Sequence, residues 1–165
     1  MSTEVWQRGA VDGYAPLLMP VAHSFLQVKE ELVVLAADLD DALLWIDSAG
    51  AASIGFHIRH IGGSTDRLLT YARGEQLTPA QLAAARAEST ERPSRTALFS
   101  EAQDALDRAL HQVRTTSVDA LLETRKVGRA GLPSTTLGLL FHAAEHATRH
   151  AGQALTTAKL LTQRR

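Results

Sequence analysis

The sequence predicts an all-α protein, a four-helix bundle with long crossover connections. Apolar residues recur at steps of three and four over several long segments, as on the buried face of an amphipathic helix. Capping residues, prolines and glycines stand where those segments begin and end. No segment shows the alternation of apolar and polar residues that is typical of a half-buried strand. With 165 residues, we expect a single helical domain over residues 1–165.

The first half of the chain predicts two long helices. Residues 1–15 are polar and form an arm or a short helical lead-in, and a helix follows from about Pro16 to Leu39. The segment S-A-G-A-A at 48–52 reads as a break. Ser53 is a suitable cap for the second helix, which runs to about Arg73.

Two more long helices and a short one are predicted in the second half. T-P-A-Q-L-A-A-A-R-A-E begins a short helix with a threonine cap, and the charged segment E-S-T-E-R-P-S-R is a loop. The third long helix runs from about Ser94 to Val113. The segment R-K-V-G-R-A-G-L-P-S-T-T is a glycine- and proline-containing loop, and Ser134 or Thr135 caps the alanine-rich last helix.

Composition excludes several classes of function. The chain has no cysteine, which rules out disulfides, thiolate zinc sites and a cysteine nucleophile. The net charge of −1 gives no reason to expect nucleic acid as a partner. Because we find neither a signal peptide nor an apolar run of membrane-spanning length, we expect a cytoplasmic protein that does not bind membranes.

Histidines are concentrated in two predicted helices. His142, His146 and His150 follow one another at four-residue steps, and His57 and His60 stand in H-I-R-H-I. Residues four apart on a helix lie on one face, about 5–6 Å apart at Cβ. Two imidazoles at that spacing can share a metal ion, and a third from a facing helix would complete an open site.

A helical wheel separates some of these histidines. His146 and His150 border the apolar face of the last helix, whereas His142 leans toward water on the side of Glu145. On the second helix the wheel does not choose between His57 and His60. A single buried histidine is usually structural, but a ladder and a second pair are hard to explain by packing, since each buried imidazole needs a polar partner.

Two other metal motifs fit less well. The string H-A-A-E-H at 142–146 matches the H-x-x-E-H of inverted zinc proteases, but the wheel places Glu145 in solvent. The di-iron bundles need Glu-x-x-His, and no glutamate here is followed by histidine three residues later.

At these residues the chain resembles the DinB/YfiT-like superfamily of small bacterial four-helix-bundle metalloproteins. S-I-G-F-H-I-R-H-I resembles the family's W-S-x-x-x-x-x-x-H pattern and places its ligand position on His60. H-A-T-R-H-A-G-Q resembles N-H-x-x-x-H-R-G-Q and places the other two ligands on His146 and His150. The family's Trp, Asn and Arg are here Ala52, Glu145 and Ala151.

The resemblance implies a divalent ion, zinc or nickel, held by His60, His146 and His150 with positions open for water or a thiol. Related proteins include transferases that use a low-molecular-weight thiol such as bacillithiol or mycothiol, and some hydrolases. His57 is then a possible general base or further ligand, and His142 a possible further ligand. Arg59 or Arg67 is a candidate for orienting an anionic small-molecule substrate, although a solvated helix face is the simpler interpretation of Arg59.

Two alternatives remain open. One is a non-catalytic, metal-stabilised homodimer that acts in a stress response or binds a ligand, in which His57 or His142 supplies a fourth ligand and closes the site. The other is a plain bundle with polar core histidines and no metal. In either the enzymatic or the structural case we expect a homodimer, since bundles of this kind often associate through helix faces.

Overall fold

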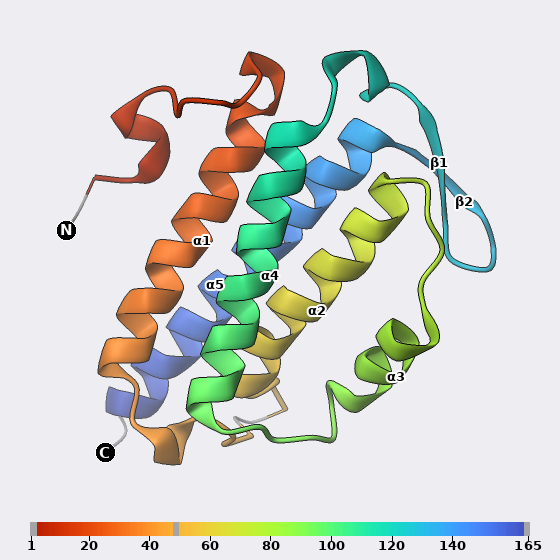
Figure 1. The fold of residues 1–165 in the computed structure, drawn as a ribbon. Helices are drawn as coiled ribbons and strands as arrows, with labels where there is room; N and C mark the ends of the chain where they lie inside the picture. Colours follow the sequence, from red (N-terminus) through yellow and green to blue (C-terminus); the bar gives the residue numbers. More distant parts are fainter. Residues whose placement is uncertain (1–2, 48–49, 164–165) are drawn as a thin grey trace.

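Four long helices pack side by side in the computed structural model, which describes residues 3–47 and 50–163 (Figure 1). They are α1 (Met19–Asp38), α2 (Ile54–Ala72), α4 (Arg95–Thr115) and α5 (Thr136–Gln163). Each of α1 and α2 packs against both α4 and α5. The short helix α3 (Pro79–Ala87) lies beside the bundle in the connection from α2 to α4. The predicted all-α bundle with long crossovers is confirmed.

The core is built from the predicted apolar stripes. The stripe of α1 is buried throughout, with Phe25 and Val28 fully enclosed. The inner face of α5 consists largely of alanine, and short side chains let neighbouring helices approach closely. The buried alanines of α5 are Ala143, Ala144, Ala147, Ala151, Ala154 and Ala158. Among the described residues, no helix is both long and apolar enough to cross a membrane.

Side-chain caps fix the helix starts that position the site. The Ser53 hydroxyl accepts a hydrogen bond from the Phe56 amide at 3.2 Å and starts α2. Thr78 and Gln81 form a reciprocal capping box at α3. At the other end of α2, Gly74 has a φ of +81°, the left-handed conformation that ends a helix. These boundaries agree with the predicted ones.

A small hairpin replaces part of the predicted loop before α5. Strand β1 (Thr124–Val127) pairs antiparallel with β2 (Leu132–Thr135), and the Gly131 amide donates to the Gly128 carbonyl at the turn. The expectation of no strand was wrong here. The reason is local: the strands are four residues long and none of their residues is buried, so they carry no apolar alternation that a sequence pattern could reveal. Both turn glycines have positive φ, which favours this tight reversal.

Short 3₁₀ turns occupy the other connections. In the N-terminal arm Val5–Arg8 forms one, as the predicted helical lead-in allows, and Asp41–Leu43 forms another after α1. Residues 1–2 of the arm and residues 48–49 of the predicted break lie outside the described residues. After the second turn, the Gly55 amide donates to the Leu44 carbonyl at 2.8 Å and fixes the entry into α2.

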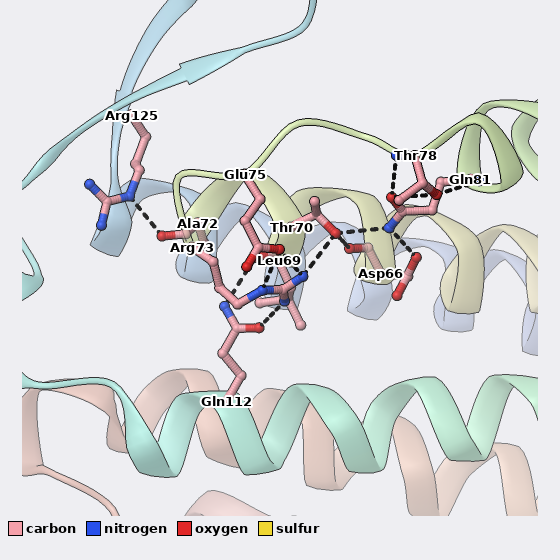
Figure 2. Close-up of polar contacts among 10 residues, drawn as sticks. All are labelled: Asp66, Leu69, Thr70, Ala72, Arg73, Glu75, Thr78, Gln81, Gln112 and Arg125. Atoms are coloured by element: carbon pink, nitrogen blue, oxygen red, sulfur yellow. Dashed lines mark hydrogen bonds and ion pairs between the residues drawn. The ribbon is translucent and has the colours of Figure 1, made fainter.

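Polar side chains tie the C-terminal half of α2 to its neighbours (Figure 2). From α4, Gln112 donates to the Leu69 carbonyl at 3.0 Å. Gln81 of α3 donates to the Asp66 carboxylate at 2.6 Å. Arg125 of β1 donates to the Ala72 carbonyl at 2.8 Å. The helix that carries His57 and His60 is therefore held from three sides.

Candidate metal centre

Three histidines meet where α2 packs against α5. The Nε2 atoms of His60 and His146 are 3.0 Å apart. The ring centroid of His150 lies 4.6 Å from that of His60 and 4.6 Å from that of His146. One ring nitrogen from each of the three lies within 4.8 Å of the others, and all three residues are half-buried. Among the described residues, this is the group of histidine and acidic side chains whose spacing could hold a metal ion.

The backbone explains why these three come together. His146 and His150 stand one turn apart on α5, next to the buried Ala147 and Ala151, so both rings lie along the interface with α2. The helical wheel placed this pair at the border of the apolar face. For α2 the wheel left the choice open, and the packing of the two helices brings His60 into the cluster.

His57 lies behind the cluster as a buried neighbour of His150. Only 6% of His57 is exposed, and its Nδ1 is 2.9 Å from the Nδ1 of His150. One of these two nitrogens carries a proton and donates a hydrogen bond to the other. When that proton is on the Nδ1 of His150, the lone pair of its neutral ring is on Nε2, where it can bind a metal ion.

His142 stands apart from the cluster. Its side chain is 52% exposed, its ring centroid is 5.5 Å from that of His146, and its Nδ1 lies 3.5 Å from the Glu145 carboxylate. Glu145 also forms an ion pair with Arg149 on the outer face of α5. The glutamate of the H-x-x-E-H string therefore pairs with an outward-facing arginine.

A carboxylate that the sequence did not single out supports His60. Glu88 is 7% exposed, and its Oε2 lies 2.6 Å from the His60 Nδ1. It follows α3, in the segment that was predicted to be a charged loop. No sequence signal identifies it, because its two partners are on α2 and the contact depends on how the α2–α4 connection folds back. The His60 ring also stacks on the ring of Phe56, at a centroid distance of 5.4 Å.

The two arginines proposed for substrate binding are both engaged with this connection. Arg67 forms an ion pair with Glu88. Arg59 donates to the Ala87 carbonyl at 2.8 Å and to the Glu91 carboxylate at 2.6 Å, and only 15% of its side chain is exposed. The expectation that Arg59 lies on a solvated face was therefore wrong, whereas a substrate contact of Arg59 or Arg67 stays a prediction. Both guanidinium groups contact the segment that carries Glu88.

The surroundings of His57, His146 and His150 favour the neutral imidazole. Burial, together with the neighbouring histidines, lowers the pKa of His150 to about 4. Burial likewise lowers the pKa values of His57 and His146, with the charge of His60 adding to the effect. Neutral rings with free lone pairs are the form that binds metals. Burial by itself would raise the pKa of Glu88, but its bonds to His60 and Arg67 outweigh this and the net shift is downward.

His23 and His111 lie outside the cluster of three histidines. His23 bonds to the Gly9 carbonyl at 2.9 Å, and His111 is exposed on α4. Tyr71 and Ser64 are both buried in α2. The Ser64 hydroxyl and the His146 Nδ1 are buried without a hydrogen-bond partner among the described residues.

Comparison with protein-family models identifies the family of this chain. The model of the DinB superfamily matches residues 24–154, which include all three histidines of the cluster. The chain belongs to the DinB superfamily. The expected resemblance is thereby confirmed.

Solved structures with the same fold come from several bacteria. A DinB-like protein from Bacillus cereus ATCC 10987 superposes with a TM-score of 0.67 at 14% identity, over 88% of this chain and 91% of that one. A conserved protein from Enterococcus faecalis gives 0.63 at 14% identity, over 88% and 97% of the two chains. A protein from Streptococcus pneumoniae gives 0.64 at 12% identity, over 97% of each chain. No curated protein sequence matches this chain significantly. At these identities the likeness extends to the DinB fold alone.

The donor set of this DinB-superfamily chain fits a divalent transition-metal ion. Imidazole nitrogens suit zinc, nickel and copper, and metal–nitrogen distances of about 2.0–2.1 Å for zinc are within reach of rings this close. The three positions that depart from the family motifs leave the three histidines of the cluster together. Ala151 is buried in the core, Glu145 pairs with Arg149, and Ala52 precedes the cap of α2. That His60, His146 and His150 bind a metal stays a prediction.

Proposed function

We propose that this protein is a divalent-metal-dependent enzyme in which His60, His146 and His150 are the metal ligands. The observation that carries the proposal is the convergence of three half-buried imidazoles from two helices, each able to offer a nitrogen to one point. The lowered pKa values of His146 and His150 keep the lone pairs of these two rings available near neutral pH.

An open site supports catalysis over a purely structural role. Structural zinc sites take four protein ligands, whereas catalytic ones take three and keep a position for water or substrate. Among the described residues, no fourth histidine or acidic group joins this cluster. His57 faces the Nδ1 of His150, and His142 is largely solvent-exposed. Both residues considered as a closing ligand thus have other surroundings.

The chemistry follows from the ligand set and the composition. A zinc or nickel ion bound there would act as a Lewis acid that lowers the pKa of a coordinated water or thiol. The chain has no cysteine, so a thiolate nucleophile has to arrive as a low-molecular-weight thiol. We infer transfer of such a thiol to a small electrophile, or hydrolysis, as the reaction class. His57 is too buried to reach a solvent-side substrate, and in this proposal it orients His150 in place of acting as the general base.

Metal content decides whether the site exists. Protein purified without an affinity tag is analysed by elemental mass spectrometry before and after chelation. About one zinc or nickel ion per chain, lost together with a lower melting temperature, supports the site. Absence of metal, with no stabilisation by any added divalent ion, leaves a bundle with polar core histidines.

The reaction class needs a second measurement. The cobalt-substituted protein is titrated with a small thiol such as N-acetylcysteine and its visible spectrum is recorded. A thiolate-to-cobalt charge-transfer band supports an open, thiol-binding position, and thiol-transfer and hydrolysis assays then follow on the loaded protein. A four-coordinate spectrum that no thiol or anion changes points to the metal-stabilised, non-catalytic alternative.

A further inference from the structure

The connection from α2 to α4 places a buried carboxylate against the proposed metal centre. Glu88 contacts α2 through both of its oxygens. Oε2 lies 2.6 Å from the His60 Nδ1, and Oε1 pairs with the Arg67 guanidinium. The side chain of Glu88 is only 8% exposed, so these two contacts replace most of its hydration.

Hydrogen-bond roles fix the tautomer of His60. An ionised carboxylate only accepts hydrogen bonds, so the proton of this contact is on the His60 Nδ1. A ring that binds a metal ion is neutral, and with its proton on Nδ1 the lone pair is on Nε2. This is the nitrogen that lies 3.0 Å from the His146 Nε2, inside the cluster. Glu88 therefore turns the metal-binding nitrogen of His60 toward the other two ligands.

Helix α2 has a glycine at the point where the Glu88 carboxylate approaches it. A Cβ at Gly63 would overlap Oε1 of Glu88, whereas the neighbouring Gly62 faces the Ala102 backbone of α4 at an ordinary 3.4 Å. Glycine in a helix interior is destabilising relative to alanine. The close approach of Glu88 gives Gly63 a physical reason, independent of the hydrogen bond itself.

The three ligands differ in the partner behind them. His60 has an anionic acceptor in Glu88, His150 has a neutral imidazole in His57, and the buried Nδ1 of His146 has no partner among the described residues. Partners of metal-bound histidines hold the ring in place and increase its basicity, and their loss typically costs about 10- to 100-fold in metal affinity.

We propose that Glu88 is a positioning residue of the metal centre, and that the α2–α4 connection is thereby part of the site. The proposal rests on the assignment of His60 as a metal ligand. Arg67 fixes the carboxylate, and Arg59 holds the backbone on either side of it at Ala87 and Glu91.

Two variants and a matched control test this role. Glu88→Gln keeps the size of the side chain and loses its charge, and Glu88→Ala loses both. Glu91→Gln is the control, because it removes only the charge of an exposed carboxylate that pairs with Arg59, while the Ala87 and Glu91 carbonyls still accept hydrogen bonds from Arg59. Zinc and cobalt dissociation constants are measured by competition with a chromophoric chelator. We expect affinity to fall by about 10- to 100-fold in Glu88→Ala, by less in Glu88→Gln, and to stay unchanged in Glu91→Gln.

The His60 tautomer separates positioning from general destabilisation. In the metal-free protein, long-range ¹H–¹⁵N correlation spectra should show His60 protonated at Nδ1 in the wild type and no longer so in Glu88→Ala.

The outcomes are distinct. Wild-type affinity in both Glu88 variants, or an unchanged His60 tautomer without the carboxylate, overturns the positioning role. Failure of the wild-type protein to bind any metal overturns the proposed function instead, and the tautomer measurement, which needs no metal, then still decides whether Glu88 orients the ring.

Discussion

The Nδ1 atoms of His57 and His150 lie 2.9 Å apart, so a buried histidine of α2 supports a half-buried histidine of α5. The sequence had suggested His57 as a general base or a further ligand. Its contact with the ring nitrogen of a proposed ligand, at 6% exposure, supports the orienting role that we propose for it.

His57→Phe should weaken metal binding without abolishing it. Phenylalanine keeps the ring volume and removes the nitrogen that His150 contacts, and we expect affinity to fall by about tenfold or more. His142→Ala is the comparison, since that side chain is exposed and outside the cluster. Chelator competition measures both. Loss of the ion in His142→Ala would show that the cluster has a fourth ligand.

Alanine at any one of His60, His146 and His150 should remove the metal-dependent part of the stability. An ion present at 100 times its dissociation constant stabilises the folded state by about 2.7 kcal/mol, which corresponds to about 5–10 °C in melting temperature for a chain of this length. Chelation should therefore lower the melting temperature of the wild type and leave the three variants unaffected. His111→Ala, on the exposed side of α4, should respond as the wild type does.

The metal-free protein should lose stability as the pH falls from about 6.5 to about 4. In the folded state the pKa of His150 is about 4, and those of His57 and His146 are also below the ordinary 6.5, mainly because of burial. Between these values the unfolded chain binds more protons than the folded one, so the free energy of unfolding decreases with decreasing pH. Urea denaturation in the presence of a chelator measures it. His150→Gln should flatten the profile, and an equally steep profile in that variant would assign the effect to other groups.

Gly55→Ala should destabilise the start of α2. A Cβ at this position would lie 2.6 Å from a carbon of the Trp45 ring. Because the tryptophan is packed against the core, we expect a loss of about 1–3 kcal/mol in the free energy of unfolding. Gly152→Ala on α5 meets nothing within 4 Å and should instead be neutral or stabilising by up to about 1 kcal/mol. Chemical denaturation compares the two, and equal stability of both variants would contradict the assigned contact.

Local signals determined the helices. The apolar stripe of α1, the Ser53 and Thr78 caps and the glycine after α2 are each properties of a few neighbouring residues, and the structure has them where the sequence predicted them. The spacing of His146 and His150 is of the same kind, because four residues along a helix always return to the same face. The hairpin before α5 was not predicted, for the complementary reason: its strands are short and have no buried residue, so they leave no apolar pattern in the sequence.

Tertiary packing decided the rest of the site. The wheel could not choose between His57 and His60, because both lie on the flank of α2 and only the approach of α5 determines which ring joins the cluster and which lies behind it. Glu88 was invisible in the sequence, since a glutamate in a charged segment is ordinarily solvated. Its burial depends on contacts with His60 and Arg67, 28 and 21 positions away, and on the space left by a glycine. Periodicity records which face of a helix is apolar, whereas the partners of a polar side chain are set by how separate segments meet.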